Sequence, residues 1–305
     1  MMPNNRRTTH RPARQWRPSM LSVAIAVLGF LGLAAVTYPT AAQWASSINQ
    51  SQVVSAYGSS VESAEPSAEK QLAEAREYNS TLSSGAVLVA NARVPSGTGA
   101  PGVPGVDYRK LLRVNEAGLM ARLIYPAIRA DLPIYHGTAD STLLRGAGHL
   151  EGTSLPVGGA TTHSVITAHR GLANAVMFTN LDQAKKGDRF SIDVFGEVLS
   201  YRVTDVRVVE PDETDTLRAV QSKDLVTLVT CTPLGVNTHR ILVTGERVMP
   251  TPAKDIRVAE QQPGGPGFPW WAVWFVSGIG LLCCFLWFAG RADARVRALR
   301  RFSGR

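Results

Sequence analysis

The chain has 305 residues, with 32 Lys and Arg residues against 24 Asp and Glu residues and a formal net charge of +8. Eleven of the basic residues and one of the acids lie in the two terminal tails, which leaves 21 basic and 23 acidic residues between them. A near-neutral central region offers no basic surface to a polyanion, so the composition argues against nucleic acid as a partner.

Two apolar stretches are long enough to cross a bilayer as helices. The first, MLSVAIAVLGFLGLAAVTY, runs from Met20 to Tyr38, and the second, FPWWAVWFVSGIGLLCCFLWFAG, runs from Phe268 to Gly290. Tryptophans such as Trp16 and Trp270 lie near the ends of these stretches, where indole rings favour the membrane interface. We therefore predict transmembrane helices over residues 19–42 and 268–290.

Arginine-rich tails flank both predicted spans, over residues 1–18 and 291–305. Short segments rich in Lys and Arg stay on the cytoplasmic side. We therefore expect a cell-membrane protein with both termini in the cytoplasm and the intervening region outside. The sequence PTAAQ, Pro39 to Gln43, also resembles a signal-peptide cleavage site, so a cleaved signal is the alternative. The second span would still tether the product.

Between the spans, the first region is predicted to be a helical stalk followed by a loop, together residues 43–110. Residues 59–82 are rich in Ala, Glu, Lys and Gln, which favours a solvated helix after Pro66, packed lightly as a stalk or collar. Residues 94–108 contain Gly, Pro and Ser so densely that we expect no regular element there.

From Leu111 the sequence changes to short β-branched runs broken by turn residues, which favours a mainly β closed barrel or sandwich over residues 111–250. Residues 251–267, rich in Pro and Gly, are expected to be a linker to the second span. Short helices are expected at Ser141–Arg145 and Ala175–Leu181. The predicted strands are Leu119–Ile124, Leu132–Tyr135, Ser164–Thr167, Arg189–Val194, Val198–Glu210, Leu225–Thr230 and Arg240–Val248.

Cysteine usage draws attention to one residue. Cys283 and Cys284 lie within the second span, where small apolar filler or an acylation site explains them. Cys231 is then the one cysteine of the exported region, in an oxidising compartment where structural cysteines come in pairs. We therefore expect it to be an intermolecular crosslink or a reactive thiol.

A reactive cysteine needs a group that stabilises its thiolate and a donor for the developing oxyanion. Cys231 ends the apolar run LVTLV, and Arg240 begins the run RILVTGE nine residues later. An antiparallel return after the intervening loop would bring Cys231 and Arg240 side by side.

Histidine supplies the acid and base in most such sites, and the exported region has five candidates. His169 ends the apolar run SVITAHRG and is the favoured choice, although spacing alone leaves the assignment open. His239 adjoins Arg240, so alternation along a strand would send it to the opposite face. Structural roles are expected for His136, His149 and His163.

Three segments carry a resemblance to a known family. They are DLPIYHGTADSTLLRGAGHLEGTSLPVGG, TAHRGLANAVMFTNLDQAKKGDRF and TLVTCTPLGVNTHRILVTGER, in that order between Asp131 and Arg247. Together they closely resemble the sortases, in particular the class C sortases that build pili. The resemblance implies an eight-stranded sortase-type β-barrel with short helices, here flanked by two transmembrane helices. It also implies a catalytic Cys231, His169 and Arg240, with no cofactor and no metal.

The implied reaction is transpeptidation of an LPxTG-like sorting signal carried by pilins or surface proteins. Cys231 would attack the Thr-Gly carbonyl, and an amine would resolve the thioacyl intermediate, either a pilin Lys or a cell-wall peptide. His169 as imidazolium would stabilise the thiolate and protonate the departing amine. Arg240 keeps its proton, so it would serve as an oxyanion or carbonyl donor.

Two details depart from a simple match. Class C sortases usually carry an Asp-Pro-aromatic lid motif ahead of the barrel, and this triplet does not occur here. We therefore hypothesise that residues 94–107 cover the cleft loosely or not at all, leaving Cys231 more accessible. The stretch LPVGG, Leu155 to Gly159, looks like a sorting signal but lacks the Thr, and is interpreted as a loop.

Four other functions compete with pilus assembly. Anchoring of surface proteins to peptidoglycan and peptide hydrolysis with water as acceptor would use the same residues. A membrane-anchored metal-binding module is disfavoured because the scattered Cys and His residues lack paired ligand spacing. A papain-like protease is disfavoured because Cys231 follows a strand instead of opening a long helix.

Overall fold

The computed structural model describes residues 16, 18–82, 86–88, 97–99, 106–173, 175–211, 213 and 215–303. The chain divides into two compact units, one formed by Met1–Ala41 with Phe268–Arg305 and the other by Ala42–Gly267. The hypothesis of a loose cover over residues 94–107 falls largely outside the described residues.

The first unit contains two apolar helices, α1 (Met20–Ser55) and α6 (Trp270–Ser303), each long and apolar enough to span a membrane. α1 continues past the unit boundary at Ala41 and passes through Pro39 without ending. The two helices pack closely: a Cβ added to Gly278 would lie 2.6 Å from Leu33. The absence of a side chain at Gly278 therefore permits this contact.

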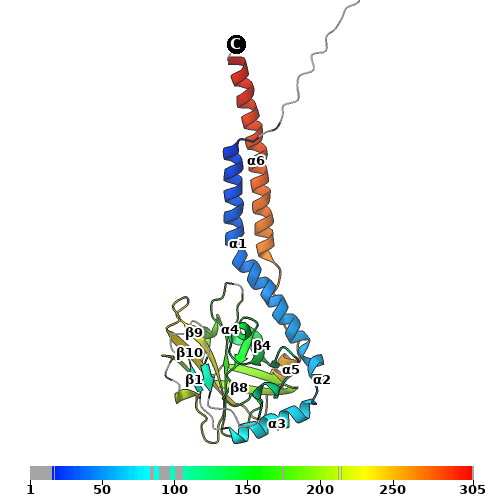
Figure 1. The fold of residues 1–305 in the computed structure, drawn as a ribbon, viewed down its shortest axis with the longest axis vertical. Coiled ribbons are helices and arrows are strands. Elements are labelled where there is room, and N and C mark those ends of the chain that lie inside the picture. Colours follow the sequence, from blue (N-terminus) through cyan, green and yellow to red (C-terminus); the bar gives the residue numbers. More distant parts are fainter. Residues whose placement is uncertain are drawn as a thin grey trace, which may run out of the picture. The chain divides into compact units, whose positions relative to one another are not determined.

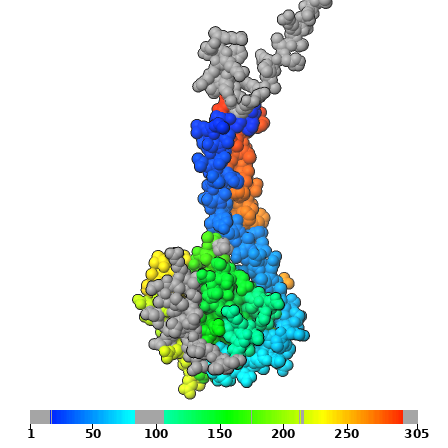
Figure 2. Space-filling view, in the orientation of Figure 1, coloured from blue at the N-terminus to red at the C-terminus, as the bar shows by residue number. Residues whose placement is uncertain are grey.

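The second unit begins with a collar, α2 (Tyr57–Glu62) and α3 (Ala68–Thr81), which Figure 2 shows in cyan against the green part of the chain. The expectation of a lightly packed, solvated helix is wrong for one face of α3, where Leu72, Ala75 and Tyr78 are buried. Their spacing of three residues places them in one stripe, and burying such a stripe excludes water from apolar surface.

The predicted eight-stranded closed barrel is confirmed within the described part of the second unit (Figure 1). The strands follow one another around it in the order β10, β8, β7, β3, β4, β5, β6 and β9, and β6 and β9 run parallel. Their bounds are β3 (Leu119–Tyr125), β4 (Ala130–His136), β5 (Ala147–His149), β6 (Thr162–Thr167), β7 (Arg189–Val194), β8 (Glu197–Val209), β9 (Asp224–Thr232) and β10 (His239–Arg247).

Four local features differ from the sequence-based expectations. β5 was not predicted, because three residues are too few to show an alternating pattern. Within the region expected to lack regular structure, Gly97–Gly99 (β2) pairs with Ala86–Leu88 (β1), since strand pairing satisfies backbone groups whatever the side chains. Ala175–Leu181 forms turns, followed by a 3₁₀ turn at Leu181–Gln183, instead of an α-helix.

The fourth difference is in the predicted linker, which contains helix α5 (Ala253–Glu260). Its carboxyl end is held by Arg122, which donates to the carbonyls of Ala259 at 2.8 Å and Gln261 at 3.2 Å. Asp255 in its first turn accepts from Ser200 Oγ at 2.9 Å. Contacts from the barrel strands thus stabilise a helix that is too short to be stable in isolation.

The barrel interior is filled by aromatic and branched side chains. Phe190 stacks on Tyr201 with ring centroids 5.5 Å apart and lies 5.6 Å from the ring of Tyr125. A Cβ added to Gly245 would lie 2.6 Å from the Phe190 ring, at the point where the register of β10 against β8 shifts. Glycine is therefore required there for the aromatic ring to fit.

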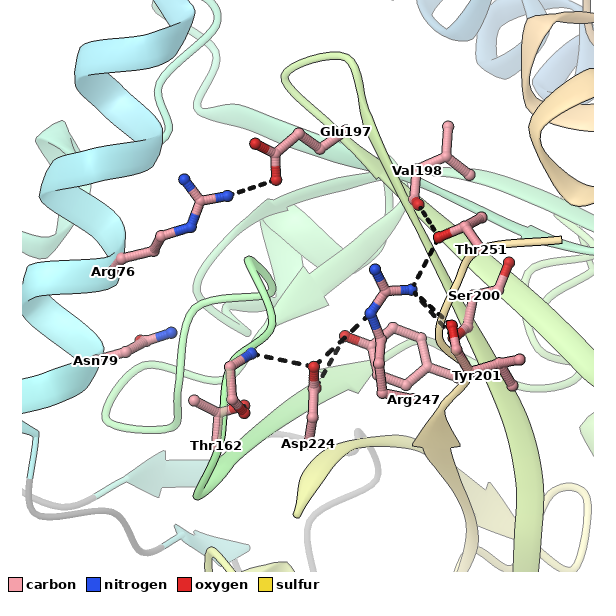
Figure 3. Close-up of polar contacts among 12 residues, drawn as sticks. Arg76, Asn79, Thr162, Glu197, Val198, Ser200, Tyr201, Asp224, Arg247 and Thr251 are labelled. Atoms are coloured by element: carbon pink, nitrogen blue, oxygen red, sulfur yellow. Dashed lines mark hydrogen bonds and ion pairs between the residues drawn. The ribbon is translucent and has the colours of Figure 1, made fainter. Parts of the chain in front are cut away.

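A polar network holds the end of the barrel where β9 begins and β10 ends (Figure 3). The Asp224 carboxylate accepts from the Gly159 amide at 3.0 Å and the Tyr201 hydroxyl at 3.2 Å, and it faces Arg247 at 3.8 Å. Burial raises the pKa of Asp224, while the Gly159 amide opposes that rise. Gly159 belongs to the LPVGG stretch, so this sequence is a loop anchored to the barrel.

Candidate active site

Cys231 and Arg240 are direct partners across strands β9 and β10. The β-branched residues of LVTLV favour the extended backbone of β9, and the Pro233–Thr238 segment turns the chain into β10. The Cys231 residue is 2% exposed and Arg240 is fully buried. Cys231 is thus a buried residue of β9 that pairs with β10, and the hypothesis that residues 94–107 leave it more accessible stays a prediction.

The Arg240 guanidinium is held by the turn that precedes its strand. Its Nη1 donates to the Asn237 carbonyl at 2.9 Å and to the His239 carbonyl at 3.0 Å. Asn237 has a φ of +61°, a left-handed conformation that asparagine tolerates better than most residues. The turn thus orients the cation at the end of the barrel that carries Cys231.

His169 lies two residues beyond the end of β6, the strand parallel to β9. The last ladder pair is Thr167 with Val229, and the Ala168 amide donates to the Val229 carbonyl at 3.2 Å. Continued by two residues, this register would set His169 opposite Cys231. His169 is 8% exposed, and its carbonyl accepts from the Phe178 amide at 3.0 Å.

Burial shifts both titrating groups toward their neutral forms. It raises the pKa of Cys231, and the nearby Arg240 charge opposes this rise. It lowers the pKa of His169, and the negative charge of Asp140 opposes this fall. The substrate-free site therefore favours a thiol and a neutral imidazole, and Arg240 and Asp140 are the charges that stabilise the ionised pair.

The other four histidines between the two apolar stretches lie in different surroundings. His149 contacts Tyr108 Oη at 2.8 Å and the Ser154 carbonyl at 2.9 Å. His136 has two backbone carbonyl partners, and His163 contacts the Arg218 carbonyl and Thr227. His239 contacts its neighbour Thr238 at 2.9 Å. These contacts tie His136, His149 and His163 to the framework of the barrel.

Two polar residues next to this site were missed from the sequence. Arg170 follows His169 and donates to Thr232, which follows Cys231, at 2.9 Å. The signal was present in the segment AHRG, but a charged residue after a strand is usually solvated, and its partner lies 62 positions away. Within the described residues, no group of three or more His, Cys, Asp and Glu side chains could hold a metal ion.

A closed eight-stranded barrel with a cysteine, a histidine and an arginine at one end defines a class of cysteine transpeptidase. The family described as "Sortase domain" matches residues 123–248. The chain belongs to the sortase family and is a cysteine transpeptidase of that family.

Solved structures similar to this chain include several C-type sortases and a sortase A from Corynebacterium diphtheriae. Sortase C-1 from Actinomyces oris is 50% identical, with 60% of this chain and 99% of that chain covered and a TM-score of 0.53. Sortase C2 of Pilus Island 1 from Group B Streptococcus is 41% identical, with 59% and 97% covered and a TM-score of 0.52. Among curated proteins, Sortase A of Bacillus anthracis is 26% identical over 47% of this chain and 69% of its own length.

Proposed function

We propose that this chain is a membrane-anchored sortase that joins an LPxTG-like sorting signal to the Lys amine of a pilin. The observation that carries the proposal is the pairing of Cys231 with Arg240 across β9 and β10, with His169 following the parallel strand β6. The similarity to sortase C2 of a pilus island favours a pilin as the substrate.

The first half of the reaction forms a thioester. The Cys231 thiol transfers its proton to the His169 imidazole, and the thiolate attacks the carbonyl carbon of the substrate Thr. The oxyanion that forms is stabilised by the positive charge of Arg240, which keeps its proton throughout the physiological pH range. The Thr–Gly bond breaks as His169 returns the proton to the departing Gly amine.

The second half transfers the acyl group to the acceptor. A neutral Lys amine attacks the thioester carbonyl and gives its proton to His169. The carbon–sulfur bond breaks, an isopeptide bond remains, and the Cys231 thiolate takes the proton back from His169. The thioester can also react with water. Burial against the barrel limits the access of water, and transfer to the amine is favoured if the acceptor is held nearby.

Membrane anchoring would supply that proximity. We propose that α1 and α6 span the membrane with both arginine-rich termini in the cytoplasm, which places the barrel outside. Enzyme, pilin and acceptor would then share one membrane surface, and tethering raises their effective concentration without new contacts.

The test uses the full chain in detergent micelles with an LPxTG-type peptide and two amine donors, a pilin with its Lys and a short wall peptide. Mass spectrometry is expected to detect the pilin conjugate and, in a trapped sample, an acylated Cys231. A Cys231→Ala variant should keep its melting temperature and form no product. Conjugation to the wall peptide alone would support anchoring to peptidoglycan, and hydrolysis alone would support a peptidase.

A further inference from the structure

Arg170 lies at the junction of the two strands that carry the proposed nucleophile and the proposed acid–base residue. Its side chain is 8% exposed and forms three contacts. Nη1 donates to Thr232 Oγ1 at 2.9 Å, Nε donates to the Thr179 carbonyl at 3.2 Å, and Nη2 pairs with the Asp182 carboxylate at 2.7 Å. A buried guanidinium with three fixed acceptors is held in one orientation.

These contacts lie where the backbone ladder ends. The paired register of β6 and β9 stops at Thr167 with Val229. One step further, Thr230 Oγ1 donates to the Ala168 carbonyl at 2.7 Å. Two steps further come His169 and Cys231, with no ladder pair between them.

The third step beyond the ladder is the contact between Arg170 and Thr232. The pair His169 and Cys231 is therefore bracketed, with the Thr230–Ala168 hydrogen bond on one side and the Arg170–Thr232 hydrogen bond on the other. The Thr230–Ala168 hydrogen bond continues the ladder, whereas the Arg170–Thr232 hydrogen bond depends on a single long side chain.

Arg170 is itself anchored by the segment that follows the His169 loop. Besides the contacts to Thr179 and Asp182, the Gly171 amide donates to Thr179 Oγ1 at 3.1 Å. The Asp182 carboxylate balances the charge of the guanidinium, which limits the destabilisation of an imidazolium at the adjacent His169. Arg170 thus connects β9 to the loop without adding an uncompensated cation to the site.

We propose that Arg170 is a positioning residue, which sets the geometry of His169 relative to Cys231 by joining the ends of β6 and β9 through Thr232. This inference rests on the proposed roles of Cys231 and His169. Proton transfer between them depends steeply on separation, and a displacement of about 1 Å can cost on the order of 100-fold in rate.

The test compares four variants of the full chain in detergent micelles, with rates normalised to the concentration of titratable Cys231. Arg170→Met removes all three donors and Thr232→Val removes one acceptor with little change in volume. Both are expected to lower kcat roughly 100-fold with KM nearly unchanged. Thr232→Ser keeps the hydroxyl and should retain most of the wild-type kcat.

The matched control is Arg122→Met. Arg122 is also buried, but it lies on β3, which carries none of the proposed catalytic residues. It pairs with Asp131 and donates to the Ala259 carbonyl of α5. This variant should lower the melting temperature about as much as Arg170→Met does, while its kcat per active thiol stays within about twofold of wild type. A kcat of Arg170→Met that likewise stays within twofold would overturn the inference.

A second readout needs no substrate. The pH profile of Cys231 alkylation by iodoacetamide should move in Arg170→Met toward that of His169→Ala, because both variants uncouple the imidazole from the thiol. A wild-type profile in Arg170→Met would also overturn the inference. Failure of the wild-type chain to transfer any peptide would overturn the proposed function, so the two failures are distinguishable.

Discussion

Asn79 on α3 forms two hydrogen bonds with the backbone of Leu155, the first residue of the LPVGG loop. Its amide Nδ2 donates to the Leu155 carbonyl at 2.9 Å, and its Oδ1 accepts from the Leu155 amide at 2.7 Å. Leu155 is 1% exposed, so water cannot replace a lost partner without rearrangement. The side chain therefore completes the backbone pairing of the loop, as a neighbouring strand would.

Replacing Asn79 by Ala leaves the buried Leu155 N–H without this partner, whereas the Leu155 carbonyl still accepts from the Val157 amide at 2.8 Å. An unsatisfied buried group costs about 1–3 kcal/mol, so the expected destabilisation is about 1–3 kcal/mol. For a unit of this size, spanning Ala42–Gly267, each kcal/mol lowers the melting temperature by about 2–4 °C. We therefore expect a decrease of roughly 2–12 °C.

The assay is thermal unfolding of the full chain in detergent, followed by circular dichroism in the β-sheet region. Ser80→Ala is the matched control on the same helix, because the Ser80 hydroxyl bonds only its own helix at Glu77 in the described structure. Asn79→Asp, as a carboxylate at neutral pH, keeps the acceptor and loses the donor, so it should fall between wild type and Asn79→Ala. A melting temperature of Asn79→Ala equal to that of Ser80→Ala would refute the reasoning.

Three further predictions concern the site and the barrel. Arg240→Met should move the inflection of the pH–rate profile for Cys231 alkylation to higher pH than in wild type. The reason is that the Arg240 charge lowers the thiol pKa, which burial raises. An unchanged or lower inflection contradicts this. His169→Ala should lower kcat by about 10²–10⁴-fold with its melting temperature retained, and peptide turnover near the wild-type rate would exclude His169 as the acid–base residue. Gly245→Ala should destabilise the barrel by about 1–3 kcal/mol through its clash with Phe190, measured by urea unfolding, and a stability equal to wild type would show that the ring can move aside.

Local patterns in the sequence were sufficient for much of the barrel. Runs of β-branched residues between turn residues predicted seven of its strands, because alternation and chain breaks act over a few residues. The pairing of Cys231 with Arg240 was predictable for the same reason, since a short loop leaves little choice but an antiparallel return. The lone cysteine outside the two apolar stretches, the arginine tails and the apolar stretches themselves are likewise properties of composition.

The tertiary structure decided everything that depends on distant partners. β5 is stable because β4 and β6 pair with it, and α3 buries Gln71 and Ala75, which a hydropathy pattern does not mark as core. The pairing of β6 with β9 joins segments about 60 residues apart, and their parallel register, continued by two residues, would set His169 opposite Cys231. The same register brings Arg170 to Thr232 and turns an arginine expected in solvent into a buried contact. Side-chain chemistry therefore pointed to the candidate reacting groups, whereas non-local strand pairing, which no short window of sequence contains, determined their arrangement.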